Sequence, residues 1–195
     1  MTKALVAIGA ATVNVLTTWL AEQSSPPLPI VWIGSHAQDF MSEKVRAHIG
    51  EIQHETANHV VGEYGELIYL QRGQTFLEDN EHVAQDRIRL EQALTKFEDV
   101  YILSSLGGGT TSYVTPYVAN IVAVKDPLMQ VILTMPAKLE PRSRHEKAQQ
   151  AFTVLQQTCP ILHVVTNSGE REQSLVETFA KRDILLAQLL NKLSC

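Results

Sequence analysis

The chain has 195 residues, of which 19% are charged and 45% apolar, and its formal net charge is −5. This composition is typical of one globular domain, spanning residues 1–195. The negative net charge and the lack of a lysine/arginine cluster disfavour nucleic-acid binding. No apolar stretch is long enough to span a bilayer, so membrane insertion is not expected. Cys159 and Cys195 match no disulfide or metal framework, which favours a cytoplasmic location without a metal site.

The predicted elements alternate between short apolar strands and longer helices. Strands are expected over residues 5–8, 30–33, 67–70, 100–104, 130–134 and 161–165. Helices are expected over residues 13–22, 41–53, 79–97, 114–124, 143–157 and from 174 onwards. Because the strands are continuous apolar runs, they favour a parallel sheet with helices on both faces. The predicted fold is therefore a three-layer α/β fold of the Rossmann-like type.

A glycine-rich turn lies between the strand at 100–104 and the helix that follows it. Glycine lets the backbone approach a ligand closely, and the first turn of a helix directs unpaired N–H groups at an anion. The turn therefore predicts phosphate binding through backbone N–H and hydroxyl groups, or else a tight turn without any ligand. The residues of this predicted phosphate site are Gly107, Gly108, Gly109, Thr110, Thr111 and Ser112.

The same turn resembles the Gly-Gly-Gly-Thr-Gly-Thr/Ser-Gly signature of the tubulin/FtsZ filament-forming GTPases. Further stretches are similar to that family, in the same order along nearly the whole chain. They are residues 33–38, residues 86–94, Thr134-Met135-Pro136, Leu139-Glu140 with Arg144, Asn167, and Phe179 with Asp183. The resemblance implies the fold of the family's N-terminal GTPase domain, with residues 174–195 as the family's central helix.

The resemblance also implies a guanine nucleotide as the ligand, GDP or GTP, with Mg²⁺ as an option alongside GTP. The Asp183 carboxylate would accept hydrogen bonds from guanine N1–H and N2–H, and Phe179, one helical turn earlier, would stack on the base. The other contacts implied for base, ribose and phosphates fall on Asn14, Glu140, Arg144 and Asn167. Each residue alone has an ordinary explanation, such as a core phenylalanine or an exposed ion pair.

The chain departs from the family pattern in ways that concern the phosphates and the reaction. The first turn carries Thr12 and Val13, and Thr111 and Tyr113 replace glycines of the signature. An acidic stretch at 78–81 stands where the family has a γ-phosphate loop, which implies GDP binding or no discrimination against GTP. The chain ends within the central helix, before the family's catalytic loop, so we expect no catalytic residues and at most weak GTPase activity.

The last helix is apolar around more than one face. Between Ile184 and Leu193 only Gln188, Asn191 and Lys192 are polar. A surface helix normally has a narrower apolar stripe, so residues 184–195 predict a homodimer or a heteromeric partner, with a full-length tubulin/FtsZ-like protein as one candidate. The expected role is cytoskeletal or regulatory in a cell-division-like process. The alternative is a degenerate interaction protein that keeps the fold and binds no nucleotide.

Overall fold

A computed structural model describes residues 3–22, 28–35, 43–56, 58–71, 81–166 and 174–194. Its strands are β1 (Lys3–Ile8), β2 (Ile30–Gly34), β3 (Ile52–Thr56), β4 (His59–Gly62), β5 (Gly65–Tyr69), β6 (Asp99–Ser105), β7 (Gln130–Thr134) and β8 (Ile161–Val165). Its helices are α1 (Ala11–Ala21), α2 (Glu43–His48), α3 (Glu81–Leu94), α4 (Thr111–Ala123), α5 (Arg142–Thr158) and α6 (Leu175–Ser194). The strands form one sheet in the order β3-β4-β5-β2-β1-β6-β7-β8.

The sheet is mostly parallel, as predicted. Strands β5, β2, β1, β6, β7 and β8 pair in parallel, whereas β3 and β4 extend the β5 edge as antiparallel strands. The predicted helix over residues 41–53 is wrong in its second half, because α2 ends at His48 and β3 begins at Ile52. Between them Gly50 adopts a φ of +73°, a left-handed conformation that commonly ends a helix.

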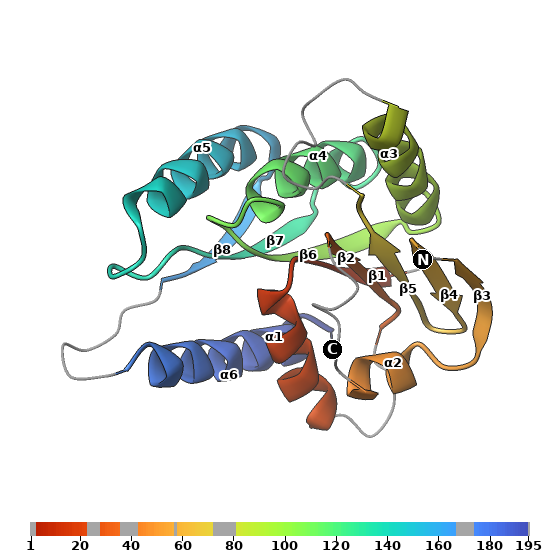
Figure 1. The fold of residues 1–195 in the computed structure, drawn as a ribbon, viewed down its shortest axis with the longest axis horizontal. Helices are drawn as coiled ribbons and strands as arrows, with labels where there is room; N and C mark the ends of the chain where they lie inside the picture. The colour runs from red at the N-terminus through yellow and green to blue at the C-terminus, as the bar shows by residue number, and fades with distance from the viewer. Residues whose placement is uncertain are drawn as a thin grey trace.

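Helices cover both faces of the sheet and bury its strands. Successive residues of β1 point to opposite faces, so Leu5 and Ala7 join the core beneath α1, α2 and α6. Val6 and Ile8 join the core beneath α3, α4 and α5 on the other face (Figure 1). All four side chains are fully buried. Burial on both faces explains why the strands are continuous apolar runs.

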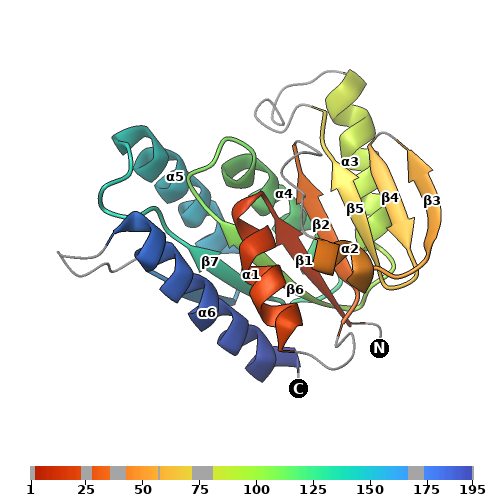
Figure 2. The same ribbon diagram turned by 60° about the horizontal axis from the view of Figure 1, so that its bottom comes forward.

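Two helices begin at the same edge of the sheet, on opposite faces. Helix α1 follows β1 and covers one face, whereas α4 follows the neighbouring strand β6 and covers the other (Figure 1). Helix α6 runs beside α1, with Leu186 and Leu190 buried in the core of that face (Figure 2). In open α/β sheets, ligands bind at the carboxyl ends of strands where the direction of the strand order reverses. The strand order reverses between β1 and β6, so the carboxyl ends of these two strands form such a place.

Candidate functional site

A cavity of about 400 Å³ opens at the carboxyl edge of β1 and β6. Its size falls within the range of small-molecule pockets. The residues that line it come from the ends of β1, β2 and β6, the starts of α1 and α4, the segment leading into α5, and α6. They are Gly9, Ala10, Ala11, Asn14, Ser35, Ser105, Leu106, Gly108, Gly109, Thr110, Thr111, Glu140, Arg144, Phe179 and Arg182.

One side of the cavity is formed by the starts of α1 and α4. Neither N-cap residue, Ala10 or Thr110, makes a side-chain capping hydrogen bond, and neither helix has an acidic residue in its first turn. The backbone N–H groups of Gly108 and Gly109 donate to no acceptor in the part of the chain that the structure describes. Two uncapped helix starts make this side of the cavity favourable for an anion.

Thr111, at the start of α4, packs against Gly9 in the turn before α1. Gly9 has a φ of +92°, and a Cβ placed on it would lie 2.3 Å from Cγ2 of Thr111. The threonine methyl therefore fills the space above the first turn. Thr111 is 6% exposed and lines the cavity, yet its Oγ1 has no hydrogen-bond partner among the described residues. A buried hydroxyl without a partner indicates a ligand or a water molecule.

Two residues of the predicted phosphate site, Gly107 and Ser112, shape the turn without lining the cavity. The Gly107 N–H donates to Oγ of Ser112 at 3.0 Å. Gly107 has a φ of +96°, and a Cβ there would lie 2.7 Å from Cγ of Pro136. The N–H of Leu106 donates to the Thr134 carbonyl at 2.9 Å and ties the turn to β7. These contacts hold the turn in its conformation.

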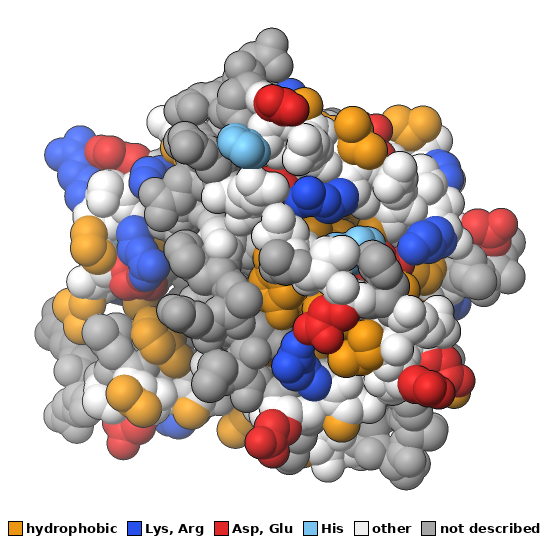
Figure 3. All heavy atoms as spheres, turned by 45° about the vertical axis from the view of Figure 1, so that its right-hand side comes forward, with side chains coloured by type: hydrophobic (Ala, Val, Ile, Leu, Met, Phe, Trp, Pro, Cys, Tyr) orange, Lys and Arg blue, Asp and Glu red, His pale blue; other side chains and the backbone are white. Residues whose placement is uncertain are grey.

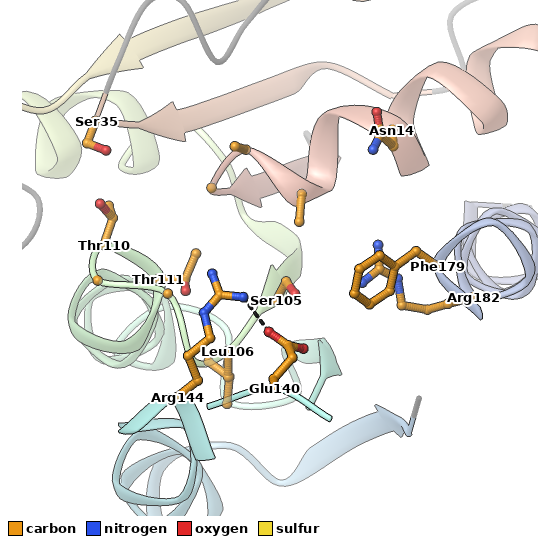
Figure 4. Close-up of a pocket in the computed structure, with 15 residues that line it drawn as sticks. Asn14, Ser35, Ser105, Leu106, Thr110, Thr111, Glu140, Arg144, Phe179 and Arg182 are labelled. Atoms are coloured by element: carbon orange, nitrogen blue, oxygen red, sulfur yellow. Dashed lines mark hydrogen bonds and ion pairs between the residues drawn. The ribbon is translucent and has the colours of Figure 1, made fainter. Parts of the chain in front are cut away.

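Glu140 and Arg144 lie together on the α5 side of the cavity (Figure 4). The Arg144 guanidinium forms an ion pair with Oε2 of Glu140, one helical turn away. The second carboxylate oxygen, Oε1, accepts the Ala137 N–H at 2.8 Å. Both oxygens of Glu140 are therefore engaged, which holds the carboxylate in one orientation at the cavity wall.

The α6 side of the cavity is formed by Phe179 and Arg182 (Figure 4). The guanidinium carbon of Arg182 lies 4.9 Å from the centroid of the Phe179 ring. Arg182 Nε and Nη2 both donate to Oδ1 of Asp183, at 2.8 and 2.6 Å. Asp183 does not line the cavity. Burial raises the pKa of its carboxyl group, and the hydrogen bonds from Arg182 oppose that shift.

The structure brings together eight of the twelve residues predicted for the site. They are Asn14, Gly108, Gly109, Thr110, Thr111, Glu140, Arg144 and Phe179. Gly107 and Ser112 lie within the turn, and Asp183 is buried against Arg182. Asn167 and residues 78–80 lie outside the described residues. Seven further residues line the cavity and were not predicted for the site, although the ends of β1, β2 and β6 were expected at this edge: Gly9, Ala10, Ala11, Ser35, Ser105, Leu106 and Arg182.

The described residues also bear on three other kinds of site: a nucleic-acid surface, a metal site and a membrane span. On the face shown in Figure 3, lysine and arginine side chains are dispersed among acidic and polar ones, and those described form no continuous basic patch. No group of three or more His, Cys, Asp or Glu residues within the described ranges is arranged to hold a metal ion. Across those ranges, too, we find no helix whose length and apolar character would let it cross a bilayer.

The chain resembles known proteins in both sequence and structure. It is 27% identical to the cell division protein FtsZ of Pseudomonas aeruginosa over 115 residues, which cover 56% of the chain and 29% of that protein. An FtsZ dimer structure from M. jannaschii matches with a TM-score of 0.72 at 20% identity, covering 100% of this chain and 55% of that one. CetZ2 of Haloferax volcanii, described as a GTPγS-bound protofilament, matches with a TM-score of 0.69 at 16% identity, covering 100% and 58%.

The chain is tubulin/FtsZ-like. The matched sequence and the shared fold confirm the resemblance inferred from the glycine-rich turn and the motifs around it. No protein-family model matches the chain. This tubulin/FtsZ-like chain spans about half the length of the solved structures, and its sequence match spans less than a third of the curated FtsZ.

Proposed function

We propose that this tubulin/FtsZ-like chain binds a guanine nucleotide, GDP or GTP, in the cavity between α4 and α6. The observation that carries the proposal is the buried Oγ1 of Thr111, which has no partner among the described residues and lies beside two uncapped helix starts. A buried donor without an acceptor costs about 1–3 kcal/mol. A phosphate oxygen of the ligand would accept from this hydroxyl and from the N–H groups of the glycine-rich turn.

The cavity walls suit the two ends of a nucleotide. The phosphates would lie over Gly108, Gly109, Thr110 and Thr111, with Mg²⁺ as an option only alongside GTP. On the α6 side, the Phe179 ring offers a face for a base. Asn14, Glu140 and Arg144 lie at the walls between these two ends, where ribose contacts are proposed.

The described lining favours binding over hydrolysis. Glu140 is the one carboxylate among the described residues that line the cavity, and both of its oxygens are engaged by Arg144 and the Ala137 N–H. The described lining also holds no histidine. A general base must reach the proton that it removes, and these residues offer none that is unengaged. We therefore propose little or no intrinsic GTPase activity.

We further propose that the chain acts by assembly. Of the apolar α6 residues, Leu186 and Leu190 are buried against α1 and the sheet, whereas Ile184 and Leu185 remain 47% and 55% exposed. The proposed interface within residues 184–195 thus centres on these two side chains. The partner would be a second copy or another protein, with a full-length tubulin/FtsZ-like protein as one candidate, in a cytoskeletal or cell-division role.

A degenerate interaction protein that binds no nucleotide is the second candidate. The observation that favours it is that each arginine lining the cavity already has a carboxylate partner. Arg144 pairs with Glu140, and Arg182 pairs with Asp183. In this alternative the fold survives as a scaffold for the surface of α6.

Calorimetric titration of the purified chain with GDP and GTP distinguishes these candidates, together with the Thr111→Val variant. Valine keeps the shape of threonine and removes the hydroxyl, so we expect GDP affinity to fall by about tenfold or more, the value of a hydrogen bond to a charged acceptor. The control is Thr153→Val on α5, where an exposed hydroxyl donates to the Gln149 carbonyl outside the cavity. Absence of binding by the unmodified chain would favour the degenerate protein.

A further inference from the structure

The two edge strands of the sheet differ in how they are protected against pairing with another chain. The pairing of β3 with β4 shifts register between Ile52 and His54, and Glu55 of β3 forms an ion pair with Arg46 at 3.6 Å. The opposite edge strand, β8, has the sequence Ile-Leu-His-Val-Val, with no Asp, Glu, Lys, Arg or Pro, and pairs with β7 in an unbroken register. Because irregular and charged edges discourage intermolecular pairing, β8 is the edge that remains open to it.

The side chains of β8 are incompletely covered by the rest of the chain that the structure describes. Val131, Ile132 and Leu133 of the neighbouring strand β7 are fully buried, whereas every residue of β8 is half-buried or exposed. Val164 of β8 is 38% exposed. Figure 1 shows β8 at the outer end of the sheet, between the layers that hold α5 and α6. A further strand beside β8 would pair with its outer backbone edge and cover these side chains together.

The sequence of β8 is complementary to itself. We consider two copies of the strand that run antiparallel about a two-fold axis at His163. Ile161 then lies opposite Val165 of the second copy, and Leu162 lies opposite Val164. Each of these cross-strand pairs is apolar, rich in β-branched side chains and free of like charges, which favours pairing. A surface that matches itself about a two-fold axis is what an isologous dimer requires.

Helix α6 extends the same surface. Val165 of β8 and Leu189 of α6 are both partly buried against one core cluster. Leu185 lies one helical turn before Leu189 and is 55% exposed. Two β8 strands that pair across an axis would bring both α6 helices to one face of a shared sheet, where Leu185 adds to the apolar contact.

We propose that β8 is a dimerisation strand, which pairs antiparallel with β8 of a second copy and joins the two sheets across a two-fold axis at His163. The inference rests on the proposed assembly, for which it names a second copy as the partner and the edge strand as the centre of the contact. The sheet already holds antiparallel strands at its other end, where β4 pairs with β3 and β5. Pairing gives the outward N–H and C=O groups of β8 partners, which adds backbone hydrogen bonds to the apolar contact of α6.

Sedimentation velocity over a range of concentrations tests the proposal with two matched variants. Val164→Lys places a lysine on β8, and the control Val154→Lys places one on α5, where the valine is 41% exposed. In the dimer the two lysines at position 164 would lie diagonally across the axis, so we expect the dimer Kd to rise by about tenfold or more. The control should change it by about twofold at most. Equal effects of the two variants, or no effect of Val164→Lys, would overturn the proposal.

Cross-linking with diamide in a Cys195→Ser background tests the register. Position 163 alone faces its own copy in the proposed pairing, with Cβ atoms about 4.5–5.5 Å apart, so His163→Cys should form a disulfide-linked dimer. Ile161→Cys would face Val165 of the second copy and should stay monomeric on a non-reducing gel. Gln53→Cys, exposed on the opposite edge strand β3, should also stay monomeric. No cross-link in His163→Cys, or equal cross-linking of all three, would refute the pairing.

Hydrogen exchange of the unmodified chain decides the proposal even if a variant does not fold. The amides of β8 should exchange more slowly at a concentration where the chain is dimeric than after dilution, whereas those of β3 should not change. Equal exchange of β8 at both concentrations contradicts the inference. A chain that is monomeric throughout refutes self-assembly and the inference together, while nucleotide binding is judged separately by the GDP titration. A dimer that Leu185→Glu dissociates and Val164→Lys does not would refute the inference alone.

Discussion

Replacing Gly9 by alanine tests the packing between the two turns that form the anion-binding side of the cavity. Gly9 has a φ of +92°, and a Cβ there would lie 2.3 Å from Cγ2 of Thr111. The left-handed backbone costs an alanine about 1–2 kcal/mol. Overpacking against a buried methyl group adds about 1–3 kcal/mol. We therefore expect Gly9→Ala to lower the free energy of unfolding by about 2–5 kcal/mol, the sum of these two costs.

Part of this loss should be recovered by a second substitution. Thr111→Ser removes the Cγ2 methyl and keeps the hydroxyl, so Gly9→Ala/Thr111→Ser would retain only the backbone cost of about 1–2 kcal/mol, beside the small loss of one buried methyl group. Urea unfolding of the four members of this cycle gives the coupling energy, which we expect to be about 1–3 kcal/mol.

A matched control comes from Gly50, which also has a positive φ, of +73°, but whose added Cβ would lie 3.1 Å from Cδ2 of Tyr64, far from Thr111. Thr111→Ser should not rescue Gly50→Ala. If the effects of Gly9→Ala and Thr111→Ser simply add, within about 0.5 kcal/mol, the contact between the two turns does not explain the need for glycine at position 9.

Three further predictions concern other parts of the chain. Burial lowers the pKa of His48, whose Nε2 donates to the Leu28 carbonyl, so the stability it confers is present above pH 6.5 and is lost as the pH falls further; the pH slope of unfolding should flatten in His48→Gln. Burial raises the pKa of Cys159 to about 11, so in a Cys195→Ser background its thiol should react with Ellman's reagent only after unfolding. Light scattering at tens of micromolar should show self-association that Leu185→Glu abolishes, and a monomeric parent chain would rule out the homodimer.

The alternation of strands and helices could be predicted because burial on both faces leaves a strong mark on the sequence. Strands such as Ile30–Gly34 are fully buried and carry almost no polar residues. The segment before α3 was harder to interpret. Ile52–Thr56 lies at the edge of the sheet and mixes apolar with polar side chains, so its composition does not separate an edge strand from a helix with a mixed face. Gly50 was the available signal for the end of α2.

The cavity residues from the turns could be predicted because a glycine-rich strand-to-helix turn has few conformations open to it. That Arg182 lines the cavity and Asp183 does not could not be predicted in the same way. On a helix, residues three and four positions after Phe179 both lie close to its face, offset in opposite directions by about 60° and 40°. Tertiary packing decides which of the two faces the cavity, and here the carboxylate turns inward onto the neighbouring guanidinium.

The two turns form even though β-branched residues stand at several positions within and beside them. Gly9 and Gly107 each supply a left-handed residue ahead of a helix, and no non-glycine residue in the described ranges has a positive φ. Thr12 sits within α1, where its Oγ1 donates to the Gly9 carbonyl at 2.7 Å, so its β-branch meets no strained backbone. Thr111 is likewise helical, and its methyl group covers Gly9. The β-branched residues therefore change what the turns present to a ligand, adding a buried hydroxyl at Thr111, while the path of the backbone depends on the two glycines that remain.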